Sequence, residues 1–260
     1  MNKKIFLIAG TQDGRKLAEF LSGKNFDVTA SVVSDYGRKL LETCADIKIN
    51  DKPLDRDDLE KILREENFNF LVDASHPYAK NISANAISAA NAAQIVYIRY
   101  ERAEINFDYE KIFHVESYEA AAVKASELGK NIYLTTGSRN LKVFVDLLKD
   151  CNLTVRILPT AEVLTQCETF GLTPKQIVAM QGPFSTELNV ELFKHAKAEV
   201  IVTKNSGQIG GADTKLEAAK ILNLPVVMID RPKIFYPNLA TNFDDILKFL
   251  ETDYKESSKI

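Results

Sequence analysis

The sequence has few of the residues that build metal and redox sites. It contains three cysteines and three histidines: Cys44, Cys151, Cys167, His76, His114 and His195. The spacing of the cysteines matches neither a zinc knuckle nor a CxxC redox motif, and the histidines are scattered, so we expect no metal ion. Isolated thiols of this kind are typical of a reducing cytosol, which predicts a cytoplasmic protein.

Charge and hydropathy argue against two further classes of partner. The net charge of −3 gives no overall basic field, so we expect no nucleic acid partner. No apolar run is long enough to span a membrane. The opening stretch MNKKIFLIAG has the basic start of a signal peptide, but its apolar run of about six residues is too short for one. Because it leads directly into a glycine turn and a helix, we interpret it as a first strand.

What the sequence does contain is a repeated alternation of apolar strand, glycine or polar turn, and amphipathic helix. KIFLIAG leads to RKLAEFLSGK, and NIYLTTG leads to NLKVFVDLLKDC. Short apolar runs between helices are typical of parallel strands covered on both faces. The pattern predicts an α/β protein with two doubly wound, mainly parallel-sheet, Rossmann-like domains.

The length of 260 residues suits two such domains. A charged stretch without periodicity, ERAEINFDYEK, marks a boundary near residues 100–111. We expect an N-terminal nucleotide-binding domain over 1–103 and a C-terminal domain over 104–260 that contributes to substrate binding. Two packed domains can bury their own cores, so a monomer is expected.

The loop after the first strand, Gly10 to Arg15, joins a glycine turn to a helix start. Free backbone N–H groups and the positive end of a helix dipole suit a phosphate there. The loop is neither GxGxxG nor Walker A, and an ordinary tight turn explains it equally well. The second strand is followed by Ser34, Asp35 and Arg38, which provide an acid for a ribose hydroxyl and an arginine for a 2′-phosphate. NADH and NADPH therefore both stay open.

The stretch DASHPY follows a third apolar strand and gathers several polar groups around a histidine. Asp73 or Ser75 can cap the following helix, and Pro77 suits its first turn. Capping does not explain His76 and Tyr78, so we expect a functional role for this motif.

Three strand-to-helix loops in the second half combine glycine with hydroxyl, amide or cationic side chains. They span residues 135–140, 180–185 and 203–215. Carboxyl ends of parallel strands share one edge, so we expect the loops to converge. Cations at or near such edges are Arg99, Arg102, Arg139, Arg156, Lys204, Lys215 and Arg231. Singly, each is better explained as a solvated surface charge; together they predict a site for an anionic ligand.

The sequence offers no local arrangement for nucleophilic catalysis. His76 has Asp73 close by, but no GxSxG elbow exists. With no metal-ligand cluster either, the chemistry is expected to come from a bound cofactor that the protein positions.

Taken as an ordered set, the motifs resemble the precorrin-6A reductases of cobalamin biosynthesis, including the form that acts on cobalt-precorrin-6A. The matching stretches are GTQDGRKLA, DASHPYA, IRYER, TTGSRNL, RILP, MQGPFS with Asn189, TKNSG with Lys215, and Arg231-Pro232. The resemblance implies a two-domain α/β fold with a cleft between the domains. It also implies reduction of one macrocycle double bond by NADH or NADPH, by hydride transfer and protonation of the adjacent carbon. Whether the tetrapyrrole substrate carries cobalt stays open.

Together with this resemblance, the motifs predict three groups of site residues. The predicted cofactor-binding residues are Gly10, Thr11, Asp13, Gly14, Arg15, Ser34, Asp73, Ser75, His76 and Pro77. The predicted substrate-binding residues are Arg99, Arg102, Thr136, Gly137, Ser138, Arg139, Gln181, Gly182, Pro183, Phe184, Lys204, Asn205, Ser206, Gly207 and Lys215. The predicted catalytic residues are His76, Tyr78 and Lys204: His76 or Tyr78 helps to place the nicotinamide, and His76, Lys204 or water donates the proton.

Two other functions compete with this one. An S-adenosylmethionine-dependent tetrapyrrole transferase also uses a glycine turn after its first strand, although it has no need for the TTGSR and TKNSG loops together. A non-catalytic nucleotide-binding sensor needs only one ligand-binding edge, whereas the sequence predicts two.

Overall fold

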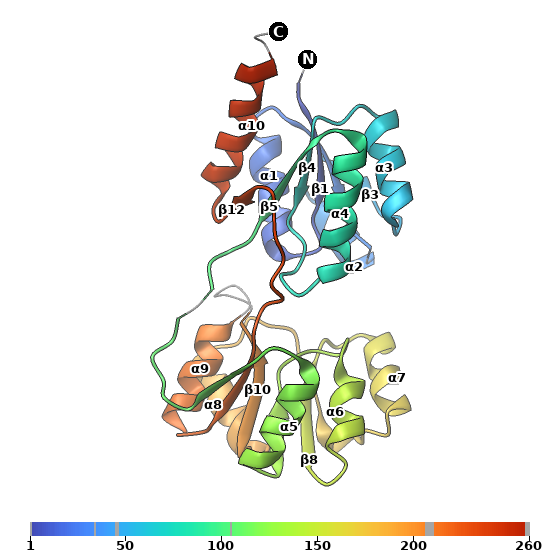
Figure 1. The fold of residues 1–260 in the computed structure, drawn as a ribbon. Coiled ribbons are helices and arrows are strands. Elements are labelled where there is room, and N and C mark those ends of the chain that lie inside the picture. The colour runs from blue at the N-terminus through green and yellow to red at the C-terminus, as the bar shows by residue number, and fades with distance from the viewer. Residues whose placement is uncertain (1, 34, 45–46, 105, 206–210, 258–260) are drawn as a thin grey trace. The chain divides into compact units, whose positions relative to one another are not determined.

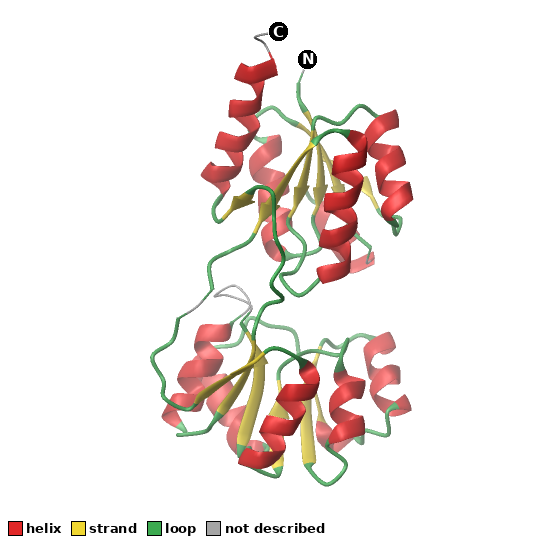
Figure 2. Cartoon of the chain, viewed as in Figure 1, coloured by secondary structure: helices red, strands yellow, loops and turns green. Residues whose placement is uncertain are grey.

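The computed structural model describes residues 2–33, 35–44, 47–104, 106–205 and 211–257. Within these ranges the chain forms two compact units, each built around one six-stranded sheet (Figures 1 and 2). Unit 1 comprises Met1–Ala103 and Pro232–Ile260, and unit 2 comprises Glu104–Arg231. All strand pairs in both sheets are parallel, so the predicted class of two doubly wound, Rossmann-like sheets is confirmed.

The sheet of unit 1 has the strand order β12-β5-β4-β1-β2-β3. Its strands are β1 (Lys4–Ile8), β2 (Asp27–Ser31), β3 (Ile47–Asn50), β4 (Phe70–Asp73), β5 (Val96–Tyr100) and β12 (Leu239–Ala240). Its helices are α1 (Gln12–Ser22), α2 (Asp35–Leu41), α3 (Arg56–Glu65), α4 (Lys80–Ala93) and α10 (Phe243–Ser257). The order reverses between β1 and β4, and ligands bind beyond the strand ends at such a reversal.

Strand β1 shows why the strands of this sheet appear in the sequence as continuous apolar runs. Ile5 and Leu7 pack with the helices α1 and α10 on one face. Phe6 and Ile8 pack with the helices α3 and α4 on the other. Because successive side chains of a strand point to opposite faces, a strand covered on both sides must be apolar at every position.

The sheet of unit 2 has the order β6-β11-β10-β7-β8-β9 and reverses between β7 and β10. Its strands are β6 (Ile112–Val115), β7 (Asn131–Leu134), β8 (Asn152–Ile157), β9 (Ile177–Ala179), β10 (Val200–Lys204) and β11 (Val226–Ile229). Its helices are α5 (Tyr118–Leu128), α6 (Leu141–Leu147), α7 (Ala161–Thr169), the short 3₁₀ helix η1 (Pro174–Gln176), α8 (Thr186–His195) and α9 (Ala212–Ile221). Phe193 of α8 and Leu216 of α9 pack on Tyr133 and Ile201 and close one face of the sheet.

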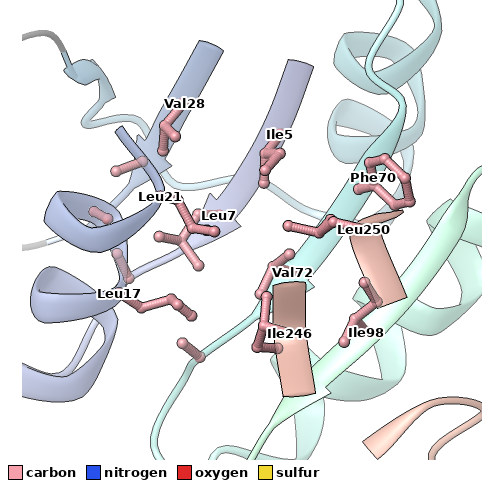
Figure 3. Close-up of a cluster of buried hydrophobic side chains, with 14 of the residues drawn as sticks. Ile5, Leu7, Leu17, Leu21, Val28, Phe70, Val72, Ile98, Ile246 and Leu250 are labelled. Atoms are coloured by element: carbon pink, nitrogen blue, oxygen red, sulfur yellow. The ribbon is translucent and has the colours of Figure 1, made fainter. Parts of the chain in front are cut away.

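The C-terminal segment differs from the prediction. The sequence placed 104–260 in one domain, but Pro232–Ile260 belongs to unit 1. Strand β12 pairs with β5, and α10 buries Ile246 and Leu250 in the same cluster as Val72 and Ile98 (Figure 3). This apolar stripe of α10 covers the sheet face beside α1, so the chain returns to unit 1 to complete its core.

No helix within the described ranges is both long enough and apolar enough to cross a membrane.

Candidate functional site

The loop after β1 is fixed by Thr11 at the point where the sheet of unit 1 reverses. The Thr11 hydroxyl accepts a hydrogen bond from the Gly14 N–H at 3.0 Å, which caps helix α1. It also donates to the carbonyl of Ala74 at 3.0 Å. Thr11 therefore joins the loops that follow β1 and β4.

The two glycines of this loop serve different purposes. A Cβ added at Gly14 would lie 2.7 Å from the Cα of Ala9, so the start of α1 packs too closely on the end of β1 for any side chain. A Cβ added at Gly10 would meet no atom within 4 Å. The backbone at Gly10 is thus open at the N-terminus of α1, as the backbone of a phosphate-binding turn must be.

A small pocket lies beside this loop, at the ends of β1, β4 and β5. It is lined by Thr11, Asp13, Ala74, Ser75, Pro77, Tyr100, Glu101 and Arg102. Asp13 is 3% exposed and forms an ion pair with Arg102 across the pocket. Arg102, predicted to bind substrate, therefore lies in unit 1 among residues predicted to bind the cofactor. Arg15 lies half-buried on α1.

Asp73, at the end of β4, is the centre of a buried hydrogen-bond network. One carboxylate oxygen accepts from the Ser75 N–H at 2.9 Å. The other accepts from the hydroxyls of Ser83 at 2.7 Å and Tyr97 at 2.8 Å. Burial, and then the Asp73 carboxylate, raise the pKa of Tyr97, so its phenol stays protonated and donates.

Arg99 of β5 completes this network from the neighbouring strand. It is 0% exposed, and its guanidinium lies 2.9 Å from Asp73 and 3.0 Å from Glu101. It also packs against the ring of Tyr236, 5.2 Å from the centroid. These contacts are internal to unit 1. Arg99 was predicted to bind substrate and Asp73 to bind the cofactor; in the structure both side chains are buried and contact each other.

His76 and Tyr78 lie in the loop between β4 and α4, and both are half-buried. The Tyr78 N–H donates to Nδ1 of His76 at 3.2 Å, and the two rings lie 5.6 Å apart. An Nδ1 that accepts a hydrogen bond carries no proton, so the neutral ring holds its proton on Nε2. His76 is in this way set up as a hydrogen-bond donor, with Pro77 buried beside it.

In unit 2 the strand ends at the reversal between β7 and β10 carry predicted substrate-binding residues. Gly137 has a φ of +78°, a left-handed conformation that favours glycine. Thr136 is buried, Ser138 is half-buried and Arg139 is exposed. Lys204 ends β10, and burial, with the positive charge of Arg139 second, lowers its pKa to about 8.

Arg156, at the end of β8, is a buried cation. It is 7% exposed and donates to the Oδ1 of Asn189 at 2.7 Å. Its guanidinium lies 4.0 Å from the centroid of the Phe184 ring. Burial lowers the pKa of Arg156, and no carboxylate in the described part of the chain pairs with it.

Lys215 of α9 joins the same electrostatic cluster. It is 7% exposed, and its pKa is lowered to about 7. Burial is the largest cause, the positive charges of Arg156 and Lys204 act in the same direction, and Asp213 opposes them. Cations thus concentrate at this edge of unit 2.

The remaining predicted substrate-binding residues differ in how exposed they are. Gln181, Gly182 and Pro183 are exposed. Asn205 is buried, and its carbonyl accepts from Nε of Arg231 at 2.9 Å. The predicted residues Ser34, Ser206 and Gly207 lie outside the described residues.

The predicted site omitted two residues that the structure places in this cluster, Arg156 and Asn189. Arg156 was recognised only as one strand-end cation among several. Asn189 is 0% exposed and lies four positions before Phe193, also 0% exposed, on the inward face of α8. A polar residue on the apolar face of a helix was the signal available in the sequence.

The fold and these strand ends define a two-unit α/β protein with polar and cationic side chains at both sheet reversals. The described residues contain no group of three His, Cys, Asp or Glu side chains suited to a metal ion. The chain belongs to the family described as precorrin-6x reductase CbiJ/CobK, whose model matches residues 4–251. The resemblance seen in the motifs is confirmed, and the family consists of reductases of cobalamin biosynthesis.

Known relatives extend over nearly the whole chain. It is 42% identical to the cobalt-precorrin-6A reductase of Priestia megaterium, over 95% of this chain and 97% of that one. It is 37% identical to the protein of the same name from Methanocaldococcus jannaschii, again over 95% and 97%. A solved structure of the CobK precorrin-6A reductase superposes with a TM-score of 0.79 at 23% identity, covering 96% of each chain, which supports the fold.

Proposed function

We propose that this protein reduces one double bond of precorrin-6A or its cobalt form, with a nicotinamide nucleotide as hydride donor. The observation that carries the proposal is the cluster of Arg139, Arg156, Lys204 and Lys215 in unit 2 of a chain whose net charge is −3. A local concentration of cations on an acidic protein suits a substrate rich in carboxylates. The names of the curated relatives support the choice of macrocycle.

Unit 1 has the features needed to hold the nucleotide. The open backbone at Gly10 and the N-terminus of α1 suit its pyrophosphate. His76 and Tyr78, next to the same pocket, would orient the nicotinamide ring. When bound, this group supplies the hydride.

We propose NADH as the preferred nucleotide. Arg38, the residue expected to bind a 2′-phosphate, lies 3.0 Å from Glu42 and 3.7 Å from Asp51. A 2′-phosphate would have to compete with both carboxylates. These groups are partly exposed, so the preference should be modest.

Lys204 is the proposed proton donor. A pKa of about 8 keeps most of its amine protonated at neutral pH, yet makes proton release far easier than from an ordinary lysine. Hydride addition to one macrocycle carbon and transfer of this proton to the adjacent carbon complete the reduction.

We also propose a monomer in the cytoplasm. Each unit has its own buried apolar clusters. The cysteines Cys44, Cys151 and Cys167 are free thiols, as is usual in a reducing compartment.

The test is an anaerobic incubation of the protein with precorrin-6A and with its cobalt form, each with NADH and with NADPH, read by mass spectrometry. A mass gain of one hydride plus one proton supports the proposal, and the best pair identifies substrate and cofactor. Folded protein that gives no gain in any of the four reactions rules it out. Methyl transfer from labelled S-adenosylmethionine would then favour the transferase, and nucleotide binding without turnover would favour the sensor.

A further inference from the structure

The loop between β4 and α4 holds a buried serine, Ser75, at two of its atoms. Its backbone N–H donates to the Asp73 carboxylate at 2.9 Å, and its Oγ accepts from Nη1 of Arg99 at 3.0 Å. The residue is 7% exposed. A hydroxyl whose oxygen already accepts a hydrogen bond turns its own proton away from that donor, so the Ser75 O–H points away from Arg99.

Arg99 can fix this hydroxyl because the arginine is itself held on several sides. Its guanidinium lies 2.9 Å from Asp73 and 3.0 Å from Glu101, and the ring of Tyr236 packs against it. Tyr236 belongs to the segment that returns to unit 1 ahead of β12. A guanidinium held in this way presents its N–H groups in fixed directions, so the fold sets the orientation of the Ser75 hydroxyl before any ligand binds.

The Ser75 hydroxyl is a spare donor in the pocket beside the first loop. Ser75 and Thr11 both line that pocket. The Thr11 hydroxyl is fully used, since it accepts from the Gly14 N–H and donates to the Ala74 carbonyl. The Ser75 hydroxyl donates to no residue in the part of the chain that the structure describes. Because buried donors normally have an acceptor, a ligand in the pocket is expected to supply one.

The charges of the pocket favour a neutral group with hydroxyls over a phosphate. Its walls carry two carboxylates, Asp13 and Glu101, and one guanidinium, Arg102. Asp13 already pairs with Arg102. A phosphate would meet repulsion from the second carboxylate, whereas sugar hydroxyls can accept from Ser75 and donate to Glu101. A sugar of the nucleotide therefore fits this pocket better than its pyrophosphate does.

The strand order decides which sugar of the nucleotide reaches the pocket. Strand β1 has β2 on one side and β4 on the other. The pyrophosphate is proposed to bind at the loop after β1, and the adenosine beyond β2, near Arg38. Ser75 follows β4 on the opposite side, next to His76, which is proposed to orient the nicotinamide. The sugar on this side is the nicotinamide ribose.

We propose that the Ser75 hydroxyl binds a hydroxyl of the nicotinamide ribose, and that Arg99 is the positioning residue that orients it. This inference rests on the proposed function for the presence of the nucleotide. It gives the buried Asp73–Arg99 pair a second task besides stability, because the same guanidinium sets up a hydrogen-bond donor in the cofactor pocket.

The experiment measures the affinity of the full chain for three probes by calorimetric titration. NADH and ADP-ribose contain the second ribose, and ADP lacks it. Ser75→Ala is expected to weaken binding of NADH and ADP-ribose about 3- to 10-fold and to leave ADP binding unchanged. The matched control is Ser88→Ala on α4: Ser88 also accepts from an arginine, Arg56 at 3.3 Å, but it is exposed. All three affinities should stay constant in this control.

A double-mutant cycle tests the role of Arg99. Arg99→Lys keeps a positive charge beside Asp73 but loses the planar fork. Tyr236→Leu is a milder change that removes only the ring packed on Arg99. Each should weaken NADH binding in the wild-type background and have little further effect in the Ser75→Ala background. An equal loss in both backgrounds is what a merely structural role would produce, and it would overturn the positioning role.

Three results would each overturn the ribose contact. Weaker binding of ADP as well would place Ser75 against the pyrophosphate or the adenosine. A loss confined to NADH would place it against the nicotinamide ring, and unchanged affinity for all three probes would leave Ser75 as a partner of Arg99 alone. Failure of the proposed function looks different: the wild-type protein would itself bind none of the probes, which would remove the nucleotide site and this inference with it.

Discussion

Each unit buries an arginine at the end of a strand, but the two arginines have different neighbours. Arg99 in unit 1 is 0% exposed and lies 2.9 Å from the carboxylate of Asp73. Arg156 in unit 2 is 7% exposed and contacts a neutral amide and an aromatic ring. A buried cation that the protein neutralises itself belongs to the scaffold, whereas one without an internal carboxylate indicates a ligand of opposite charge.

The largest expected effect is the loss of stability when the Asp73–Arg99 ion pair of unit 1 is broken. Asp73→Asn should lower the free energy of unfolding by about 3–5 kcal/mol, because it leaves Arg99 buried without its main counter-charge. Urea unfolding measures this loss, with Asp57→Asn, whose side chain is exposed on α3, as control. A loss below about 1 kcal/mol would mean that the Asp73–Arg99 pair does not stabilise unit 1. The contrast between Arg99 and Arg156 would then disappear.

The next prediction concerns catalysis from unit 2. Lys204→Met should lower kcat about 100-fold or more through loss of the proton donor, while the affinity for NADH stays constant. Lys142→Met, whose side chain is exposed on α6, is the control. Single-turnover kinetics give the measurement. If Lys204→Met reduced the substrate at an unchanged rate, another group would be the proton donor.

The glycines of the first loop provide a third test, this time of unit 1 alone. Gly14→Ala should cost about 1–3 kcal/mol of stability, because its methyl group would lie 2.7 Å from the Ala9 backbone. Gly10→Ala should leave stability within about 0.5 kcal/mol but weaken NADH binding. Thermal unfolding and nucleotide titration separate the two effects, and equal stability losses would contradict an open backbone at Gly10.

The smallest effect is a dependence of stability on pH that originates in unit 2. The pKa of Lys215 is about 7 in the folded chain and near 10.5 when unfolded, so the unfolded state binds more protons between these values. Ligand-free protein should therefore gain stability as pH rises from 7 to 9, with Lys204 contributing above pH 8. Lys215→Met should flatten this slope, and urea unfolding at several pH values gives the comparison. An unchanged slope would place Lys215 in a more hydrated setting.

Much of the fold follows from local sequence pattern. Apolar runs such as KIFLIAG predicted parallel strands because the sheet of unit 1 is covered on both faces. The return of Pro232–Ile260 to unit 1 was not predicted, since its partners β5 and α1 are distant in sequence and no local signal distinguishes them.

The candidate site was predictable only as a set of loops. Arg99 and Arg156 both follow apolar strand residues and look alike in the sequence. What separates them is register: β4 places Asp73 beside Arg99, whereas β9 places the apolar Val178 beside Arg156. Strand pairing determines which buried cation receives a carboxylate, and it is a property of the folded sheet.

The most direct test makes the same substitution at both arginines. The unfolding free energies of Arg99→Met and Arg156→Met are measured side by side in urea, without ligand. Arg99→Met should lose about 3–5 kcal/mol because Asp73 is left as an unpaired buried charge. Arg156→Met should lose only about 1–3 kcal/mol, because the buried Oδ1 of Asn189 loses its hydrogen-bond donor. Equal and large losses at both positions would contradict the account, because Arg156 would then be part of the scaffold like Arg99.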